Sequence, residues 1–229
     1  MITNNPLFGF FLCALLYYIA IWIRNKMNWG WFNPLLFSAT IIIAFLLLAD
    51  IPYVEFKQGA DIINLFLGPV TVILALPLYR QRKLLVKYRV AILGGILSGV
   101  LTSFLTVLGF SKLLGLSDVL YRSLIPHSVT TPIGISTSEM LDASVGVSII
   151  SVVITGVLGA AIAPLIMKLL KITSAVARGV AIGTSSHALG TAKAIEMGET
   201  EGAMSGLAIG LSALTTILLV IVLQFLEWC

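Results

Sequence analysis

Both histidines of this chain lie in short polar segments that interrupt strongly apolar sequence. His127 belongs to the segment 125–146 (IPHSVTTPIGISTSEMLDASVG), and His187 belongs to the segment 177–204 (ARGVAIGTSSHALGTAKAIEMGETEGAM). Glycine, serine and threonine crowd both segments. In a membrane, such backbone is tolerated only where it is buried in protein or lines a wet cavity. The two segments are therefore the first candidates for a functional site.

The two segments are copies of an internal repeat. After a shift of 60 residues the same residue types recur in six pairs: His127 and His187, Thr131 and Thr191, Ile135 and Ile195, Glu139 and Glu199, Ala143 and Ala203, and Gly146 and Gly206. Transporters use broken segments from two repeats to hold a substrate near the bilayer midplane. We therefore predict that the two copies meet and form one site.

Hydroxyl groups gather around each histidine. We call residues 127–132 the first tip and residues 184–191 the second tip. Neither tip contains an acidic residue, and half-helix starts carry free N–H groups and partial positive charge, so the tips suit a small anion such as a carboxylate. The predicted substrate-binding residues are Ser128, Thr130, Thr131, Pro132, Thr184, Ser185, Ser186, His187, Gly190 and Thr191. The alternative is close helix packing by small residues, which we prefer for Gly156–Ala160 and Gly206–Gly210.

Three residues could carry charge or a proton. His127 and His187 could bind substrate or move a proton because imidazole titrates near physiological pH, although a buried histidine is more often a hydrogen-bonded core residue. Lys193 could balance a substrate's charge or pair with Glu196 or Glu199. No further histidine or cysteine lies at a ligand spacing, so we expect neither a metal nor a cofactor.

The acidic residues that follow the tips have a structural interpretation. Glu139 and Asp142 precede one predicted spanning helix, and Glu199 and Glu201 precede the next. Carboxylates at those positions complement the helix dipole, and Ser136 with Glu139 has capping-box spacing. We expect these acids to stabilise helix starts.

A catalytic interpretation is not supported. Residues 183–187 (GTSSH) superficially resemble a serine nucleophile turn, but His187 stands where the G-x-S-x-G pattern requires glycine. Adjacent serine and histidine in one loop do not by themselves make a triad. We expect no enzyme activity.

Composition sets the class of protein. Of the 229 residues 59% are hydrophobic and 10% are charged, and the mean hydropathy is +1.06. Soluble domains carry about 25% charged residues, so the chain is predicted to be an all-α polytopic membrane protein. No lysine or arginine precedes Arg24, so we expect a retained first helix and not a cleaved signal peptide. Two cysteines do not suggest a disulfide framework.

Apolar runs predict the spanning helices. The runs cover residues 5–23, 33–49, 62–79, 90–110, 143–167 and 203–226. A span needs about 20 residues, so we expect about five to seven spanning segments and two broken polar segments, 117–142 and 174–199. Gly68, Pro69 and Pro77 predict a kink in the third run.

Loop charges predict an orientation. Basic residues in loops 24–32 and 80–89 place these loops in the cytoplasm and the N-terminus outside. The next basic cluster, around Lys168, is also inside if segment 117–142 is a re-entrant hairpin. Segment 174–199 then re-enters from the cytoplasm, and the C-terminus is outside. Two such units form an inverted repeat, although two crossing broken helices would give a similar sequence.

The position where the repeat begins suggests that the chain has two functional parts. We expect residues 1–111 to form a scaffold and homodimer interface, and residues 112–229 to form a mobile inverted-repeat transport unit, as in an elevator transporter. Asn33, Pro34, Gly68 and Pro69 are the scaffold-side candidates for contact with substrate.

The segment 177–208 (ARGVAIGTSSHALGTAKAIEMGETEGAMSGLA) closely resembles the signature of the LrgB/CidB family of membrane proteins. Supporting matches are NPLL at 33–36, ALPLY at 75–79, and LIP at 124–126 with SVTTPI at 128–133. At His127 relatives often carry lysine, arginine or glutamine.

The resemblance implies two competing functions in a bacterial plasma membrane. One is antiholin-like regulation of murein hydrolase activity and cell lysis with a small LrgA/CidA-type membrane partner. The other is transport, because plastidic relatives move glycolate and glycerate and some bacterial members are associated with pyruvate. The anion-suited tips favour the second. We therefore expect alternating-access transport of small monocarboxylates, facilitated or proton-linked, with no role in nucleic-acid binding.

Overall fold

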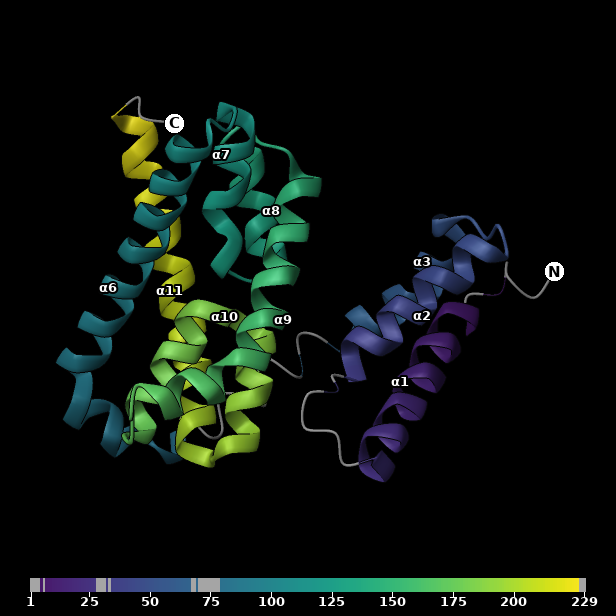
Figure 1. Ribbon diagram of the computed structural model, residues 1–229, viewed down its shortest axis with the longest axis horizontal. Coiled ribbons are helices and arrows are strands. Elements are labelled where there is room, and N and C mark those ends of the chain that lie inside the picture. Colours follow the sequence, from purple (N-terminus) through teal and green to yellow (C-terminus); the bar gives the residue numbers. More distant parts are fainter. Residues whose placement is uncertain are drawn as a thin grey trace. The chain divides into compact units, whose positions relative to one another are not determined.

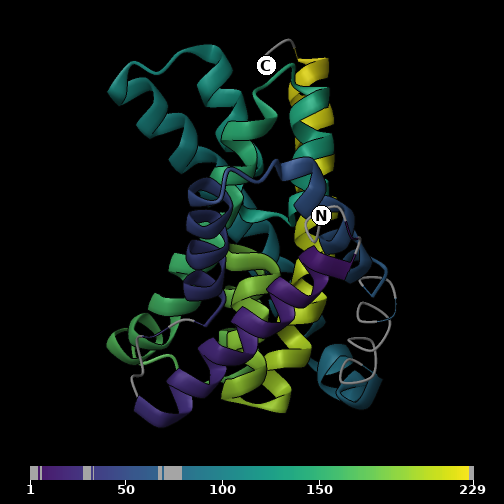
Figure 2. The same cartoon turned by 90° about the vertical axis from the view of Figure 1, so that its right-hand side faces the viewer.

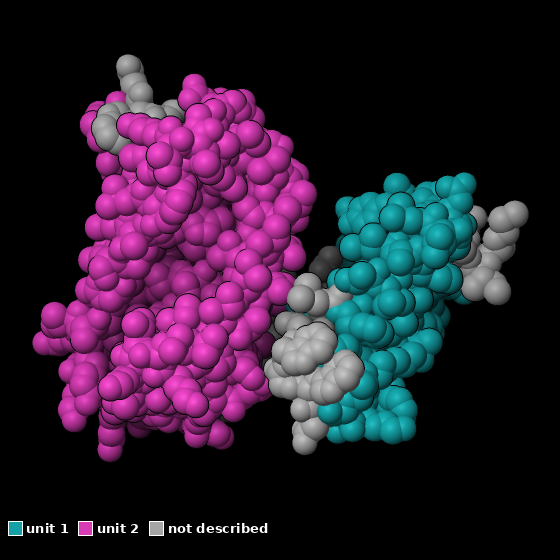
Figure 3. Space-filling model, in the orientation of Figure 1, with its two compact units in different colours: residues 1–73 teal, residues 74–229 magenta. Residues whose placement is uncertain are grey.

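The computed structural model describes residues 5, 7–27, 32, 34–66, 69 and 79–226. The chain divides into two compact units, residues 1–73 and 74–229, and each unit is described by itself (Figure 3). Every regular element in the described residues is a helix. The all-helical class expected from composition is confirmed.

The helices bounded within the described residues of unit 1 are α1 (Leu7–Met27), α2 (Pro34–Leu48) and α3 (Tyr53–Asn64). Helix α1 contacts both α2 and α3. Gly9 of α1 lies against the backbone of α3, where a Cβ would meet the Phe56 carbonyl and lie 3.2 Å from Gly59 Cα. These two glycines let the helices approach closely.

Helix α3 corrects one expectation. The sequence analysis placed no helix between the apolar runs 33–49 and 62–79, but most of that stretch, including Glu55 and Asp61, is helical. Helical hydrogen bonds satisfy its backbone, and Gly59 gives it a packing face on α1. The predicted kink at Gly68 and Pro77 lies outside the described residues, as does Asn33. Pro34 is buried at the start of α2, and Pro69 is exposed.

Unit 2 is built on three long helices with two broken segments between them. The long helices are α6 (Arg82–Leu114), α9 (Val145–Leu169) and α11 (Glu199–Phe225). The first broken segment contains α7 (Asp118–Leu124), the 3₁₀ helix η2 (Ile125–Ser128) and α8 (Thr131–Met140). The second is α10 (Ala175–Met197). Figure 1 shows α7 and α8 at one end of the unit and α10 at the other, and Figure 2 shows the same separation.

Helix α6 begins earlier than the sequence predicts. Residues 82–89 were expected to form a basic loop, but they are the first turns of α6, with a departure from helical geometry at Tyr88 (φ −107°, ψ 16°). Lysine and arginine are good helix formers, and a helix of 33 residues is about 50 Å long, so it extends well beyond a hydrocarbon core of about 30 Å. The charges can therefore stay helical and still lie outside the apolar layer.

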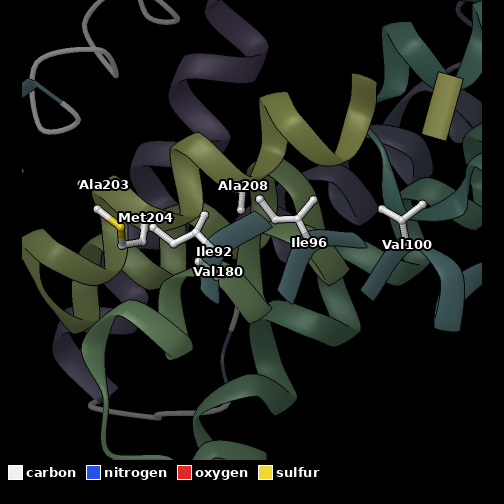
Figure 4. Packing of buried hydrophobic residues seen from close by; sticks show 7 residues of the cluster. All are labelled: Ile92, Ile96, Val100, Val180, Ala203, Met204 and Ala208. Atoms are coloured by element: carbon white, nitrogen blue, oxygen red, sulfur yellow. The ribbon is translucent and has the colours of Figure 1, made fainter. Parts of the chain in front are cut away.

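The centre of unit 2 is packed by α6, α10 and α11. One buried apolar cluster combines branched side chains of α6 with a valine of α10 and with two alanines and a methionine of α11: Ile92, Ile96, Val100, Val180, Ala203, Met204 and Ala208 (Figure 4). In a bilayer apolar burial gives little drive for helix association, so close van der Waals contact across small residues holds such helices together.

Four of the described helices, α1, α6, α9 and α11, are long and apolar enough to span a membrane, and residues 37–48 of α2 form a shorter apolar helix. Helix α10 has 23 residues but is not among these four, because its sequence is polar. The protein is therefore a multi-pass membrane protein by the length and composition of its helices.

Candidate functional site: two facing breaks in unit 2

The first broken segment reverses direction at its tip. Val129 and Thr130 are extended between η2 and α8 (ψ 176° and 152°), and Pro132 lies in the first turn of α8, as predicted. At the other end of the segment, Arg122 Nη1 donates a hydrogen bond to the Leu141 carbonyl over 3.4 Å. Residues before and after the tip are therefore neighbours.

Serine hydroxyls tie this segment to α9. The Ser148 hydroxyl donates to the Ser123 carbonyl over 2.7 Å, and the Ser138 hydroxyl donates to Ser148 Oγ over 2.6 Å. The backbone N–H of Ser144 donates to Ser123 Oγ over 2.9 Å. All three side chains are fully buried. Both limbs of the segment are thereby fixed to one helix, which positions the first tip.

The second broken segment reverses at His187. This residue has φ 41° and ψ −137°, inside what is otherwise one long helix. Ala194 packs in the same buried cluster as Ile182, and a Cβ on Gly190 would lie 2.9 Å from Ile182 Cγ2. Such contacts are impossible in a straight helix, where residues eight apart are separated by about 12 Å. The limbs 175–186 and 188–197 therefore lie side by side.

The two tips face each other. The first broken segment and α10 occupy opposite ends of the unit, yet η2 contacts α10 (Figure 1). The contact brings the segment that contains His127 to the helix that contains His187. One element of each repeat copy is therefore in contact with the other, and a common binding site stays a prediction.

His127 is held by both ring nitrogens. Its Nδ1 donates to the Leu124 carbonyl over 2.9 Å, because a carbonyl can only accept. In the neutral ring Nε2 is then the acceptor, and it lies 3.2 Å from the hydroxyl of Ser103 on α6. Ser103 fixes the orientation of the imidazole and was not among the predicted residues.

His187 is buried and bonded to the backbone of α9. Its Nε2 donates to the Val152 carbonyl over 2.9 Å. The ring fits because residue 156 is glycine, where a Cβ would lie 2.6 Å from Nε2. A positive φ is uncommon for a side-chain-bearing residue and persists where the surroundings over-determine it. The hydrogen bond and the glycine contact supply that constraint.

Thr191 completes the fastening of the second tip. Its hydroxyl lies 3.0 Å from the His187 carbonyl, to which it donates, and 2.6 Å from Ser205 Oγ of α11. Gly183 lies against the same serine, where a Cβ would be 2.8 Å from Ser205 Cα. The second tip is therefore anchored on two spanning helices, α9 through His187 and α11 through Thr191.

One hydroxyl of the second tip is buried without a hydrogen-bond partner among the described residues. Thr184 is 5% exposed, and its Oγ1 is buried without a hydrogen bond in the described part of the chain. Ser128 of the first tip is also buried, with 5% of its surface exposed. A buried hydroxyl without a partner costs about 1–3 kcal/mol, so such groups are expected to be satisfied by a ligand or water.

The other tip residues lie around these groups. Ser185 is exposed and its hydroxyl lies 3.0 Å from that of buried Ser186. Thr130 and Thr131 are half-buried, Pro132 is exposed, and Gly190 is buried between the limbs of α10. The sequence analysis named these residues as a binding set; the structure puts them at or beside the two breaks, and their role in binding stays a prediction.

Charged residues near the site are mostly paired. Lys193 Nζ lies 2.8 Å from Glu196 Oε2, the pairing considered from sequence. Glu199 and Glu201 lie in the first turn of α11, as expected, and buried Glu201 is 3.7 Å from Arg178 Nη1. Neither Glu139 nor Asp142 lies in the first turn of α9.

The predicted capping box is therefore wrong. Ser136 is in the middle of α8 and its hydroxyl donates to the Pro132 carbonyl over 3.2 Å, so it caps no helix. Glu139 lies in the last turn of α8, and Asp142 has a left-handed backbone (φ 51°) in the connection to α9. The Ser136 and Glu139 spacing resembles a capping box, but both residues lie inside α8, which continues to Met140.

Sequence reasoning missed the residues of the long helices that receive the tips. They are Gly99 and Ser103 of α6, Val152, Gly156 and Gly159 of α9, and Ser205 of α11. From sequence, Gly156 was expected only to allow close helix packing. The structure shows close packing at Gly156, and the group that packs there is the second tip. A Cβ at Gly159 would clash with Ser186, and one at Gly99 would lie 2.7 Å from Thr184 Cγ2.

The chemistry available at this site is hydrogen bonding to a small polar solute. The tips supply hydroxyls, the imidazole of His187 and the backbone at the start of α8, and they contain no carboxylate. No group of three or more His, Cys, Asp or Glu side chains that could hold a metal ion occurs among the described residues.

Comparison with known proteins agrees with the resemblance read from the sequence. The model of the LrgB-like family matches residues 13–226, which is nearly the whole chain. No solved structure matches it. The matched region contains both broken segments and all four long apolar helices apart from the first six residues of α1. The chain is a member of the LrgB-like family of membrane proteins.

Proposed function

We propose that this protein transports small monocarboxylates, of the size of pyruvate, glycolate or glycerate, across the bacterial plasma membrane. The observation that carries the proposal is the meeting of two repeat-related helix breaks, with the buried and unpartnered hydroxyl of Thr184 at one of them. Broken helices of opposed repeats are how secondary transporters bind substrate at the midplane.

The polarity of the tips supports an anion. An ionised carboxylate accepts hydrogen bonds and donates none, and the Thr184 hydroxyl is a donor without an acceptor among the described residues. Bonds from neutral donors to a charged acceptor are stronger than bonds between neutral groups. The absence of acidic residues from residues 127–132 and 184–191 means that an anion meets no like charge there.

The arrangement of the segments supports alternating access. In the proposal, each broken segment is a re-entrant hairpin followed by one spanning helix, so the two units insert in opposite orientations. Both termini then lie outside. Exchange between inward- and outward-open states follows if the compact unit 74–229 moves relative to residues 1–73, which act as a scaffold and form the interface of a homodimer.

Reconstituted uptake tests this function. The purified protein in liposomes is given radiolabelled pyruvate or glycolate, with and without a small LrgA/CidA-type partner. Saturable uptake by the chain alone is the expected result, and Ser128→Ala and Thr184→Val should abolish it in protein that remains folded. Absence of saturable uptake in both preparations would refute transport and favour the antiholin-like, lysis-regulating role.

A further inference from the structure

A cavity apart from the two tips lies where α6 ends and α7 begins. Its volume is about 410 Å³, and its polar lining residues are Ser111, Lys112, Asp118 and Tyr121. Cavities of this size accommodate small organic groups. None of these residues takes part in the proposed transport site.

Ser111 indicates that the cavity holds a polar ligand. The residue is 5% exposed, and its Oγ has no hydrogen-bond partner in the described part of the chain. A helical serine usually satisfies its hydroxyl on the carbonyl three or four residues earlier, as Ser98 does with Gly95. Leaving a buried hydroxyl unsatisfied is unfavourable, so a group that enters the cavity would relieve this cost.

The charges of the cavity indicate a ligand with both signs. Lys112 lies in the last turn of α6 and Asp118 in the first turn of α7, and both are exposed. Neither forms an ion pair with another described residue. Each complements the dipole of its own helix, but helix dipoles do not explain the unsatisfied hydroxyl of Ser111 between them. A ligand with an anionic and a cationic group would satisfy all three.

The surroundings favour a lipid over a water-soluble molecule. Phe110, Leu113 and Val119 on the same two helices are exposed large apolar side chains. Helix α6 is a membrane-span candidate, and the cavity lies at its end, where the hydrocarbon layer gives way to head groups. Acyl chains would cover these side chains while the head group enters the cavity.

We propose that this cavity binds the head group of phosphatidylethanolamine. The Lys112 ammonium pairs with the phosphate, the Ser111 hydroxyl donates to a phosphate oxygen, and the Asp118 carboxylate accepts from the ethanolamine ammonium. A phosphate beside a primary ammonium is the shared chemistry of the lipid and of soluble phosphoethanolamine. The site is independent of the transport proposal, because lipid binding is measured without any substrate.

Native mass spectrometry of the full chain in mild detergent tests the site. The protein is titrated with phosphatidylethanolamine and, separately, with phosphatidylglycerol of the same acyl chains. We expect phosphatidylethanolamine to bind about tenfold more tightly, because one charge-assisted hydrogen bond is worth about that factor. Asp118→Asn should remove this preference, Lys112→Gln should weaken both lipids, and Ser111→Ala should weaken both without loss of folding.

Matched variants and a soluble arm make the test decisive. Asp142→Asn and Lys83→Gln remove one exposed charge of each sign away from the cavity lining and should leave the lipid preference unchanged. Equal binding of the two lipids by the unaltered chain, or an unchanged preference in Asp118→Asn, would overturn the proposal. Binding of soluble phosphoethanolamine as tight as that of the lipid would overturn the assignment to a membrane lipid.

Discussion

Gly156 is the position where one added methyl group tests the geometry of the second tip most directly. A Cβ there would meet Cε1 of His187, lie 2.6 Å from Nε2, and lie 2.9 Å from Leu189 Cδ1. The imidazole is buried and bonded to Val152 of the same helix, so it cannot yield without losing that bond. Gly156→Ala should therefore displace His187 and the break that it forms.

The expected magnitude follows from three contributions. Overpacking a well-packed site costs about 1–3 kcal/mol. Loss of the bond from His187 Nε2 to the Val152 carbonyl costs about 1 kcal/mol more. Alanine gains about 1 kcal/mol over glycine inside a helix, which offsets part of this. The net cost is about 2 kcal/mol, which corresponds to about a 30-fold smaller equilibrium constant for the native tip relative to displaced arrangements.

Uptake and thermal stability are the two measurements. Gly156→Ala should reduce pyruvate uptake into liposomes and lower the apparent Tm in detergent. The matched control is Gly210→Ala, since that glycine is also in a spanning helix and an added Cβ meets no atom within 4 Å. We expect the control to keep full uptake. Equal uptake by the two variants would show that His187 does not pack on α9 in the working protein, and the assignment of the second tip would fail.

Three further predictions concern the site and its placement in the membrane. Thr184→Val removes a hydroxyl that has no hydrogen-bond partner among the described residues, so the apparent Tm should stay unchanged or rise while uptake is lost. A lower Tm with normal uptake would contradict a substrate-binding role. Glu201→Gln removes a buried charge 3.7 Å from Arg178 Nη1 and should destabilise the protein by about 1–3 kcal/mol. A Tm equal to that of the unaltered protein would show that the ion pair does not contribute to stability. In a cysteine-free background, Leu116→Cys should react with an impermeant thiol reagent from outside and Thr173→Cys only from the cytoplasm, and labelling of both from one side would exclude the hairpin topology.

The spanning helices could be predicted from sequence because their signal is local. Runs of about 20 apolar residues need no knowledge of their neighbours, and α1, α9 and α11 follow the expected runs closely. The same reasoning failed at α3 and at the start of α6, where polar and basic residues were taken for loops. Charged residues indicate that a segment is exposed to water. They do not distinguish a loop from a helix that extends beyond the apolar layer.

The two tips could also be located from sequence. Glycine, proline and hydroxyl residues in otherwise apolar sequence indicate irregular backbone, and the 60-residue repeat relates one segment to the other. Structure was needed to identify their neighbours. Ser103 and Gly156 lie 24 and 31 positions before the histidines they touch, and no spacing in the sequence marks either as a partner.

Sequence by itself determined the class of this protein, its long helices, its family and the two positions where the chain breaks, because each depends on composition or on short patterns. Tertiary structure alone decided that the chain folds back at His187, that η2 meets α10, and that the Thr184 and Ser111 hydroxyls are buried without partners. Burial and unsatisfied hydrogen bonding are properties of a side chain's neighbours in space. The chain brings those neighbours from distant helices, so the polar segment around His187 becomes half of a site only when α6, α9 and α11 close around it.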